Sequence, residues 1–295
     1  MTTSNDVIGF VGIGAMGTPM AGNLARAGYK VTVFDLDAAR AEKLAREAGV
    51  TVAASLSELG AASDIIITML PEGKAVRSAL CGDKDSFKNC ILERAKKNAL
   101  IVDMSSSSPM GTRELGEVLA NRGLQFIDAP VSNGVKGAIA ATLSIMVGGK
   151  ADVFERIKPL FACMGKTITR VGDIGAGQVT KACNQLALLV ATQGVAESLH
   201  LAARLGADPG KVREVLMGGV AASRVMDLFG KRMVDRNFEN GIDTRLYHKD
   251  LGIILGLAHE AGLASPGGAL VMQQINALMG QGRGRDDLGA LITVL

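Results

Sequence analysis

Val7-Ile-Gly-Phe-Val-Gly12-Ile-Gly14-Ala-Met-Gly17 places a short apolar run directly before three glycines spaced G-x-G-x-x-G. In a strand–turn–helix unit, Gly12 permits a tight turn, Gly14 lets the backbone approach a pyrophosphate, and Gly17 lets the next helix pack closely. A chain with 37 glycines can produce this triplet by accident. Its place after a predicted strand and before a helical stretch favours a dinucleotide-binding turn. The turn comprises Gly12, Ile13, Gly14, Ala15, Met16 and Gly17.

A second predicted strand, Lys30–Phe34, runs directly into Asp35. An acidic residue about 20 positions after the glycines is expected to accept a hydrogen bond from the ribose 2′-hydroxyl. Its negative charge also repels a 2′-phosphate. The sequence therefore predicts NAD as the cofactor, while Arg40 leaves NADP open.

The first half of the chain alternates β-branched runs with helical stretches, which is typical of a parallel sheet with crossover helices. After residue 171 the pattern changes to long segments with a 3.6-residue period. We predict an α/β chain: an N-terminal Rossmann-type, doubly wound sheet over residues 1–171 and an all-helical domain over residues 172–295. The predicted strands are Val7–Val11, Lys30–Phe34, 64–69, Leu100–Asp103, Gln125–Asp128, 144–147 and 167–171, and the first predicted helices are 20–27, Ala38–Ala48 and 112–121.

Composition narrows the classes of protein. The 295 residues are 48% hydrophobic and 21% charged, as in a soluble globular protein, and the net charge of +3 is too small to indicate nucleic acid or an anionic membrane. Four cysteines and three histidines lack metal-type spacing, so no metal site is expected and the thiols fit a reducing cytoplasm. The N-terminus lacks a signal-peptide pattern, and the apolar run 186–190 looks too short and too polar to span a bilayer.

Lys181 is the one charged residue between positions 174 and 196. Such a helix is expected to be buried on most sides, and a desolvated lysine has a lowered pKa suited to proton transfer. Asn184 lies three positions later and therefore on the same helix face. Gly177, one turn earlier, is expected to leave room for a substrate. The alternative is that Lys181 snorkels to solvent or pairs with a carboxylate such as Glu197 or Asp250.

A second candidate site follows a predicted strand at Asp128-Ala-Pro-Val-Ser-Asn-Gly134. Ligands bind at the carboxyl edge of such sheets, and Ser132, Asn133 and Gly134 offer a hydroxyl and backbone N–H groups to an anion. An ordinary Ser-Asn-Gly turn explains the pattern equally well. The polar run 103–109 ends another strand at the same edge, where its hydroxyls either cap the next helix or touch the nicotinamide ribose.

Taken in order, these motifs resemble those of the β-hydroxyacid dehydrogenases, the family of 3-hydroxyisobutyrate dehydrogenase and tartronate semialdehyde reductase. The resemblance covers nearly the whole chain and rests on residues 9–24, the loop 128–134, Gly177-x-x-x-Lys181-x-x-Asn184 and Lys249-Asp250-Leu251. It implies NAD(P)-dependent interconversion of a short β-hydroxyacid and its semialdehyde. The residues it implies are Lys181 as acid/base with Asn184, Ser132, Asn133 and Gly134 on the substrate carboxylate, and Leu70, Pro71, Ser106 and Lys249 beside the cofactor.

Two departures from the family pattern are visible. The substrate loop of the family usually reads Ser-Gly-Gly, whereas this chain has Asn133 in the middle, whose amide is expected to donate a further hydrogen bond or to narrow the pocket. Ser106 stands where threonine is common. Arg224 and Arg245 are expected either to bind a second polar group of the substrate or to form surface ion pairs.

The sequence is also compatible with two other functions. They are an NADP-dependent semialdehyde or imine reductase of the same superfamily, and a cofactor-binding relative without catalysis. Asp35 argues against NADP, and Lys181 argues against both imine chemistry and a non-catalytic protein. Small, apolar residues in the second half predict packing against another subunit, as a homodimer or homotetramer, with a small-molecule hydroxyacid or semialdehyde as substrate.

Overall fold

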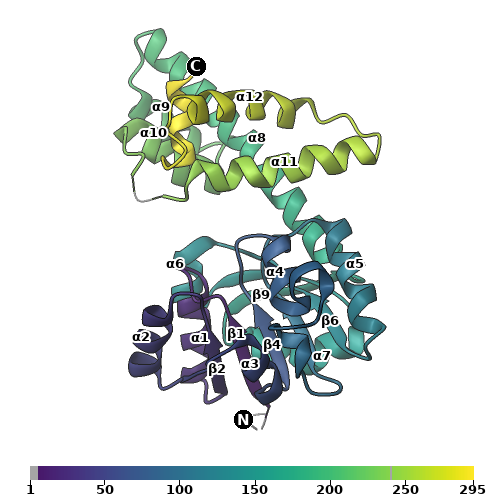
Figure 1. Cartoon of the computed structure of the whole chain (residues 1–295). Helices are drawn as coiled ribbons and strands as arrows, with labels where there is room; N and C mark the ends of the chain where they lie inside the picture. The colour runs from purple at the N-terminus through teal and green to yellow at the C-terminus, as the bar shows by residue number, and fades with distance from the viewer. Residues whose placement is uncertain (1–5, 240) are drawn as a thin grey trace. The chain divides into compact units, whose positions relative to one another are not determined.

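The computed structural model describes residues 6–239 and 241–295. The chain divides into two compact units, Met1–Lys181 and Ala182–Leu295, each described here by itself (Figure 1). The domain boundary predicted after residue 171 stays a prediction. The predicted absence of a signal pattern concerns mainly residues 1–5, which lie outside the described residues.

The first unit is a sheet with interspersed helices. Its strands are β1 (Val7–Val11), β2 (Lys30–Phe34), β3 (Thr51–Val52), β4 (Ile65–Thr68), β5 (Leu100–Asp103), β6 (Gln125–Asp128), β7 (Val131–Ser132), β8 (Leu143–Gly148) and β9 (Gly165–Gly172). Its helices are α1 (Gly17–Arg26), α2 (Ala38–Ala48), α3 (Leu56–Ala62), α4 (Gly73–Cys81), η1 (Asp83–Asp85), η2 (Ile91–Glu93), α5 (Pro109–Ala120), α6 (Gly134–Ile139), α7 (Ala151–Ala162) and the start of α8 (Ala176–Arg204).

The strand order is β3-β2-β1-β4-β5-β6-β8-β7, with β9 paired to β8. The chain moves outward from β1 to β3 and then returns to β4 on the other side of β1. Ligands bind at such a reversal, beyond the carboxyl ends of the strands. The reversal therefore places the turn after Val11 and the loop after Thr68 at one crevice.

The sheet departs from the sequence expectation in two respects. Strands β1 to β6 are parallel, but β8 pairs antiparallel with β6 and β7, so the sheet is mixed rather than purely parallel. The two-residue strands β3 and β7 were not predicted, because they are too short to show alternation.

Both faces of the sheet are covered, as a doubly wound fold requires. Successive side chains of a strand point to opposite faces. In β4, Ile65 and Ile67 join the core cluster that contains Leu24 of α1 and Ile157 of α7, whereas Ile66 joins the cluster of α3, α4 and α5. A strand buried on both faces reads as a continuous apolar run, which is why β4 is Ile-Ile-Ile-Thr.

The second unit is helical, and its described residues contain no strand, only an isolated bridge between Asp243 and Asp287. Its core gathers Leu189 and Leu199 of α8 with Leu251, Ile275 and Leu291. Its elements after α8 are α9 (Pro209–Met217), η3 (Met226–Gly230), α10 (Lys231–Asp235), α11 (Thr244–Glu260), α12 (Pro266–Gly280) and η4 (Leu288–Thr293).

Helix α8 has 29 residues and belongs to both units. Among the described residues it is the one helix long and apolar enough to cross a membrane by length and composition, and 33% of its most apolar window is buried. The expectation from residues 186–190 alone, too short and too polar, was therefore wrong for the whole helix. One such helix is weak evidence for a membrane, because core helices of globular proteins pass the same test.

Candidate active site

The glycine turn between β1 and α1 has the geometry that its spacing predicts. Gly12 has a φ of +94° and its N–H donates to the Phe34 carbonyl at 3.0 Å. Gly17 lies against the Gly12 carbonyl so closely that no side chain fits there, whereas a Cβ on Gly14 would meet nothing within 4 Å. The open space at Gly14 is a cradle of the kind a pyrophosphate fills, so these residues fit a dinucleotide.

Asp35 is bound to this turn. Its Oδ2 accepts from the N–H of Ile13 at 2.6 Å and its Oδ1 accepts from Asp37 at 2.9 Å, while an Arg40 nitrogen lies 3.7 Å from Oδ1. The carboxylate thus holds the end of β2 against the glycine turn. Its negative charge and the Arg40 guanidinium both lie beside the position expected for the ribose.

The loops after β4 and β5 are hydrogen-bonded to each other. The N–H of Leu70 donates to Ser105 Oγ at 2.9 Å, and the buried Asp103 carboxyl accepts from Thr68 Oγ1 at 2.9 Å and from the Ser105 N–H at 3.0 Å. Burial raises the pKa of Asp103 despite these donors. The bonds fix the backbone directly before two residues predicted to line the cofactor, the exposed Pro71 and the half-buried Ser106.

The loop after β6 carries the predicted carboxylate-binding residues. Ser132 ends β7 and is paired with Ser144, and Asn133 follows with a left-handed φ of 87°. The Asn133 amide donates to the Thr142 carbonyl at 2.9 Å. The amide thus donates a further hydrogen bond, as one of the two expectations had it, and this bond bridges the two ends of its own loop.

A substitution series at Asn133 tests this bridge. We expect Asn133→Ala to lower the free energy of unfolding by about 1–2 kcal/mol, because alanine tolerates the left-handed region poorly. Asn133→Gly removes the same hydrogen bond but relieves the backbone and is expected to cost less. Urea denaturation of both variants measures the difference. Equal stability of the two variants would contradict the backbone argument.

Asp128, at the end of β6, holds the start of α8. Its Oδ1 accepts from the Gly175 N–H at 2.7 Å and its Oδ2 from the Gln178 N–H at 2.9 Å. Gly177 lies so close that an added Cβ would be 2.7 Å from Asp128 Oδ2. The expectation that Gly177 leaves room for a substrate was therefore wrong, because that space is taken by Asp128 and by the Met146 carbonyl.

The same carboxyl predicts a pH dependence of stability. Burial raises the pKa of Asp128 from 3.8 to about 6, with a further contribution from Asp103 and with the two N–H donors opposing it. The folded state then keeps a proton that the unfolded chain loses near pH 4. The stabilisation is complete below that pH and disappears as the pH rises through 6, about 3 kcal/mol in all. Denaturation of Asp128→Asn between pH 4 and 7 should lack this slope; an unchanged slope would contradict the assignment.

Lys181 lies beside the predicted substrate loop. Its Nζ donates to the Val131 carbonyl at 2.8 Å, directly before Ser132. The side chain is half-buried, and the neighbouring Val179 and Cys183 are exposed, so the predicted burial on most sides was wrong for this part of the helix. The low charge of the stretch reflects alanine, glycine and amide residues rather than complete burial.

Asn184 and Lys249 belong to the second unit and are linked by two other side chains. Asn184 Nδ2 donates to Gln185 Oε1 at 3.0 Å, and Gln185 Nε2 donates to Asp250 Oδ2 at 2.8 Å. Lys249 Nζ lies 3.1 Å from Asp250 Oδ1. Asp250 is thus engaged by Lys249 and Gln185, and Glu197, the other acid considered for Lys181, accepts from Gln193.

The remaining candidates, Arg224 and Arg245, are exposed. Arg245 forms an exposed ion pair with Asp243 at 2.8 Å, the ordinary role considered for it. In the part of the chain that the structure describes, no group of three or more His, Cys, Asp or Glu side chains is placed to hold a metal ion.

Three polar residues of these networks were not predicted from the sequence: Gln178, Gln185 and, as the residue that contacts both Gln185 and Lys249, Asp250. Gln178 and Gln185 are 1% and 7% exposed. One signal was visible: between positions 174 and 196, where Lys181 is the one charged residue, both glutamines lie within one turn of a predicted catalytic residue. The partners that give them a role come from distant positions, so no spacing rule identified them.

The fold and the site define a nicotinamide-dinucleotide-dependent oxidoreductase. Residues 7–172 match the family described as the NAD-binding domain of 6-phosphogluconate dehydrogenase, and residues 175–295 match the NAD-binding domain of NADP-dependent 3-hydroxyisobutyrate dehydrogenase. The chain belongs to the β-hydroxyacid dehydrogenase family.

Individual relatives agree along the whole chain. It is 41% identical over 289 residues to a 2-hydroxy-3-oxopropionate reductase of Escherichia coli, covering 98% of this chain and 96% of the relative. It is 34% identical to a mitochondrial 3-hydroxyisobutyrate dehydrogenase of Drosophila melanogaster, covering 98% and 89%. The solved structure of Mycobacterium tuberculosis 3-hydroxyisobutyrate dehydrogenase with L-serine superposes with a TM-score of 0.88 at 32% identity, covering 98% of both chains.

Proposed function

We propose that this enzyme interconverts a short β-hydroxyacid and its semialdehyde, with 2-hydroxy-3-oxopropionate as the first substrate to test. The observation that carries the proposal is the hydrogen bond from Lys181 Nζ to the carbonyl of Val131, next to Ser132. It brings a proton donor to the loop predicted to bind a carboxylate. The relative with 41% identity carries the name of that reductase.

Each residue has a distinct task in this proposal. The glycine turn, Asp35, Leu70, Pro71 and Ser106 would hold NAD(P), which supplies or accepts the hydride when bound. Ser132, with the backbone N–H groups of residues 133 and 134, would hold the substrate carboxylate. Lys181 would donate a proton to the carbonyl oxygen in reduction and take it back in oxidation. Asn184 and Lys249 would orient substrate and cofactor.

A panel assay tests the proposal. Oxidation of NADH and NADPH is followed at about 340 nm, the nicotinamide absorbance of the reduced cofactor, with 2-hydroxy-3-oxopropionate and other semialdehydes. The reverse direction is tested with 3-hydroxyisobutyrate, L-serine and 2-(hydroxymethyl)glutarate, compounds in the names of relatives. Tight NADH binding without turnover of any compound would refute the proposal and favour a cofactor-binding protein.

The runner-up, imine reduction, has less support. An imine reductase from Myxococcus stipitatus superposes with a TM-score of 0.67 at 20% identity, a likeness that shows the fold alone. Including a ketone with an amine in the panel tests it, and turnover of that pair in preference to every semialdehyde would favour the rival.

For the cofactor we propose a preference for NAD over NADP. The Asp35 carboxylate is held in place by two N–H groups and would repel a 2′-phosphate. The Arg40 guanidinium partly offsets that charge from 3.7 Å. The ratio of kcat/KM for NADH and NADPH measures the preference, and a ratio favouring NADPH would overturn it.

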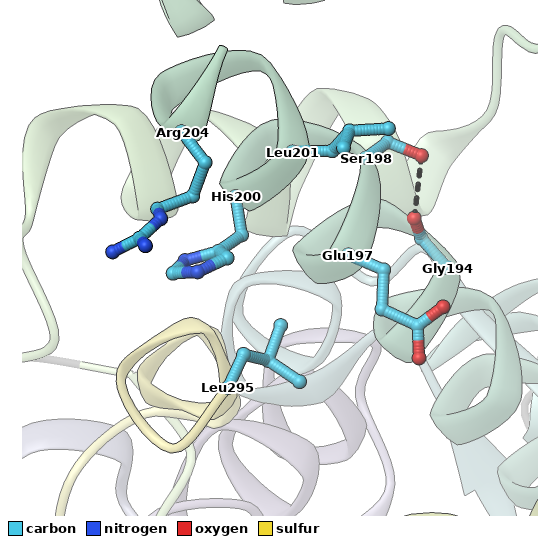
Figure 2. Close-up of a pocket in the computed structure, with 7 residues that line it drawn as sticks. All are labelled: Gly194, Glu197, Ser198, His200, Leu201, Arg204 and Leu295. Atoms are coloured by element: carbon cyan, nitrogen blue, oxygen red, sulfur yellow. Dashed lines mark hydrogen bonds between the residues drawn. The ribbon is translucent and has the colours of Figure 1, made fainter.

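We also propose that a second copy of the chain packs on α8 as a homodimer or a higher homo-oligomer. An open groove of about 620 Å³ is lined by Gly194, Glu197, Ser198, His200, Leu201 and Arg204 of α8 and by Leu295 (Figure 2). A Cβ on Gly194 would meet nothing within 4 Å, and Leu201 is 59% exposed. Glu197 and Arg204 give the groove both signs of charge, which suits the self-complementary contact of a two-fold axis.

Size-exclusion chromatography with light scattering measures the molar mass of the wild type and of Gly194→Arg and so tests the proposed oligomer. We expect an oligomer for the wild type and a smaller species for the variant, because the long side chain fills the groove. A monomeric wild type would refute the proposal.

The proposed location is the cytoplasm, supported by four free cysteines, of which Cys81 and Cys90 are buried. Fractionation of cells expressing the chain tests it.

A further inference from the structure

The buried side-chain amide of Gln178 joins the start of helix α8 to the loop after β5. Gln178 is 1% exposed, and its Nε2 donates to the Ser105 carbonyl at 2.8 Å while its Oε1 accepts from the Ser107 N–H at 3.0 Å. These two partners flank Ser106, the residue predicted to line the cofactor. Both hydrogen-bonding ends of the amide are therefore used on a single short loop.

The loop that Gln178 holds is itself anchored. Ser105 Oγ accepts from the Leu70 N–H at 2.9 Å, and Ser107 Oγ donates to Asp103 at 3.2 Å. The Gln178 N–H, in turn, donates to Asp128 at 2.9 Å, so the first turn of α8 is held at two strand ends. The cofactor loops and this turn consequently form one hydrogen-bonded body.

Lys181 lies three residues after Gln178, on the same face of α8. Any displacement of the Ser105–Ser107 backbone is therefore transmitted through a rigid helical turn to the predicted proton donor. A displacement of about 1 Å at reacting groups can lower a rate by about 100-fold. The Gln178 amide can therefore hold the distance between the cofactor loop and Lys181 constant.

We propose that Gln178 is a positioning residue that couples the cofactor loop at Ser106 to Lys181. The inference rests on the proposed function of Lys181. When a bound dinucleotide orders the Ser105–Ser107 backbone, the first turn of α8 becomes ordered with it. A residue that only packs in the core would stabilise both segments without linking them.

Gln178→Met tests the coupling, because it keeps the length of the side chain and removes both hydrogen bonds. We expect kcat with the best semialdehyde to fall about 10- to 100-fold with little change in KM. Amide hydrogen exchange supplies a readout independent of turnover: NADH should slow exchange in residues 175–181 of the wild type but not of the variant. The matched control is Thr180→Val, since the Thr180 hydroxyl donates to the Ala176 carbonyl of its own helix.

A kcat for Gln178→Met within threefold of wild type, or an unchanged effect of NADH on exchange in residues 175–181, would overturn the inference. If this variant does not fold, Gln178→Glu takes its place. That carboxylate still accepts from the Ser107 N–H but has no proton to donate to the Ser105 carbonyl. The same loss of exchange protection is expected, and its absence would equally overturn the inference. Lack of turnover by the wild type would refute the proposed function, while the exchange measurement still tests the coupling.

Discussion

Lys181→Ala is expected to lower kcat for semialdehyde reduction by about 10³-fold, within the range typical of a lost general acid. The amine is hydrogen-bonded to the Val131 carbonyl at 2.8 Å, so the substitution removes the proton donor that lies next to Ser132. NADH affinity should change little, because the glycine turn and Asp35 are untouched. Steady-state kinetics and NADH fluorescence titration measure the two quantities.

Lys181→Arg separates charge from proton transfer. The guanidinium keeps a positive charge but does not release its proton near neutral pH. We therefore expect this variant to be nearly as impaired as Lys181→Ala. Lys43→Ala, an exposed lysine whose amine lies 3.8 Å from Glu47, is the control and should behave as wild type. Substantial turnover by Lys181→Ala would remove the acid/base assignment.

Asp287→Ala is expected to lower the free energy of unfolding of the second unit by about 3–5 kcal/mol, as for a broken buried ion pair. The Asp287 carboxylate is fully buried, pairs with Arg232 and accepts from the Gly289 N–H at 2.9 Å. Burial raises its pKa even though Arg232 favours the charged form. Alanine would leave the Arg232 guanidinium and the start of η4 without this acceptor.

The neighbouring residue provides the control for that experiment. Asp286 pairs with Arg283 at 2.8 Å, and both side chains are 31% exposed. Asp286→Ala should therefore cost less than about 1 kcal/mol, as for ion pairs in contact with water. Urea denaturation followed by far-UV circular dichroism measures both variants. Similar losses for the two would contradict the assigned difference in burial.

Much of the first unit could be predicted because its signals are local. Strands β1, β2, β5 and β6 have the predicted bounds, and α2 also matches. In each case a buried strand shows as a run of β-branched or apolar residues, and a helix shows its 3.6-residue period. The glycine turn was predicted in detail because the spacing itself encodes the close contact of Gly17 with the Gly12 carbonyl.

The error at Gly177 came from contact with a residue distant in sequence. Gly177 suggested space for a substrate, but Asp128 of another strand occupies that space. The Asn133 amide does donate a further hydrogen bond, but its acceptor, Thr142, could not be identified from the sequence. The local sequence shows which polar groups are present. Which hydrogen-bonding partner each group contacts depends on the order of the strands in the sheet.

By itself, the sequence determined the family and the Rossmann-type arrangement of the first unit, and it singled out Lys181 as the proposed proton donor. Those features depend on periodicity and fixed spacing, which are properties of neighbouring residues. Only the tertiary structure decided what holds Lys181 in place. Gln178, one turn before it, is hydrogen-bonded to Asp128 and to the Ser105–Ser107 loop, and Lys181 itself donates to the Val131 carbonyl. Their sequence separations of 50 to 73 residues are closed by the order of the strands, which brings the ends of β5 and β6 to the first turn of α8.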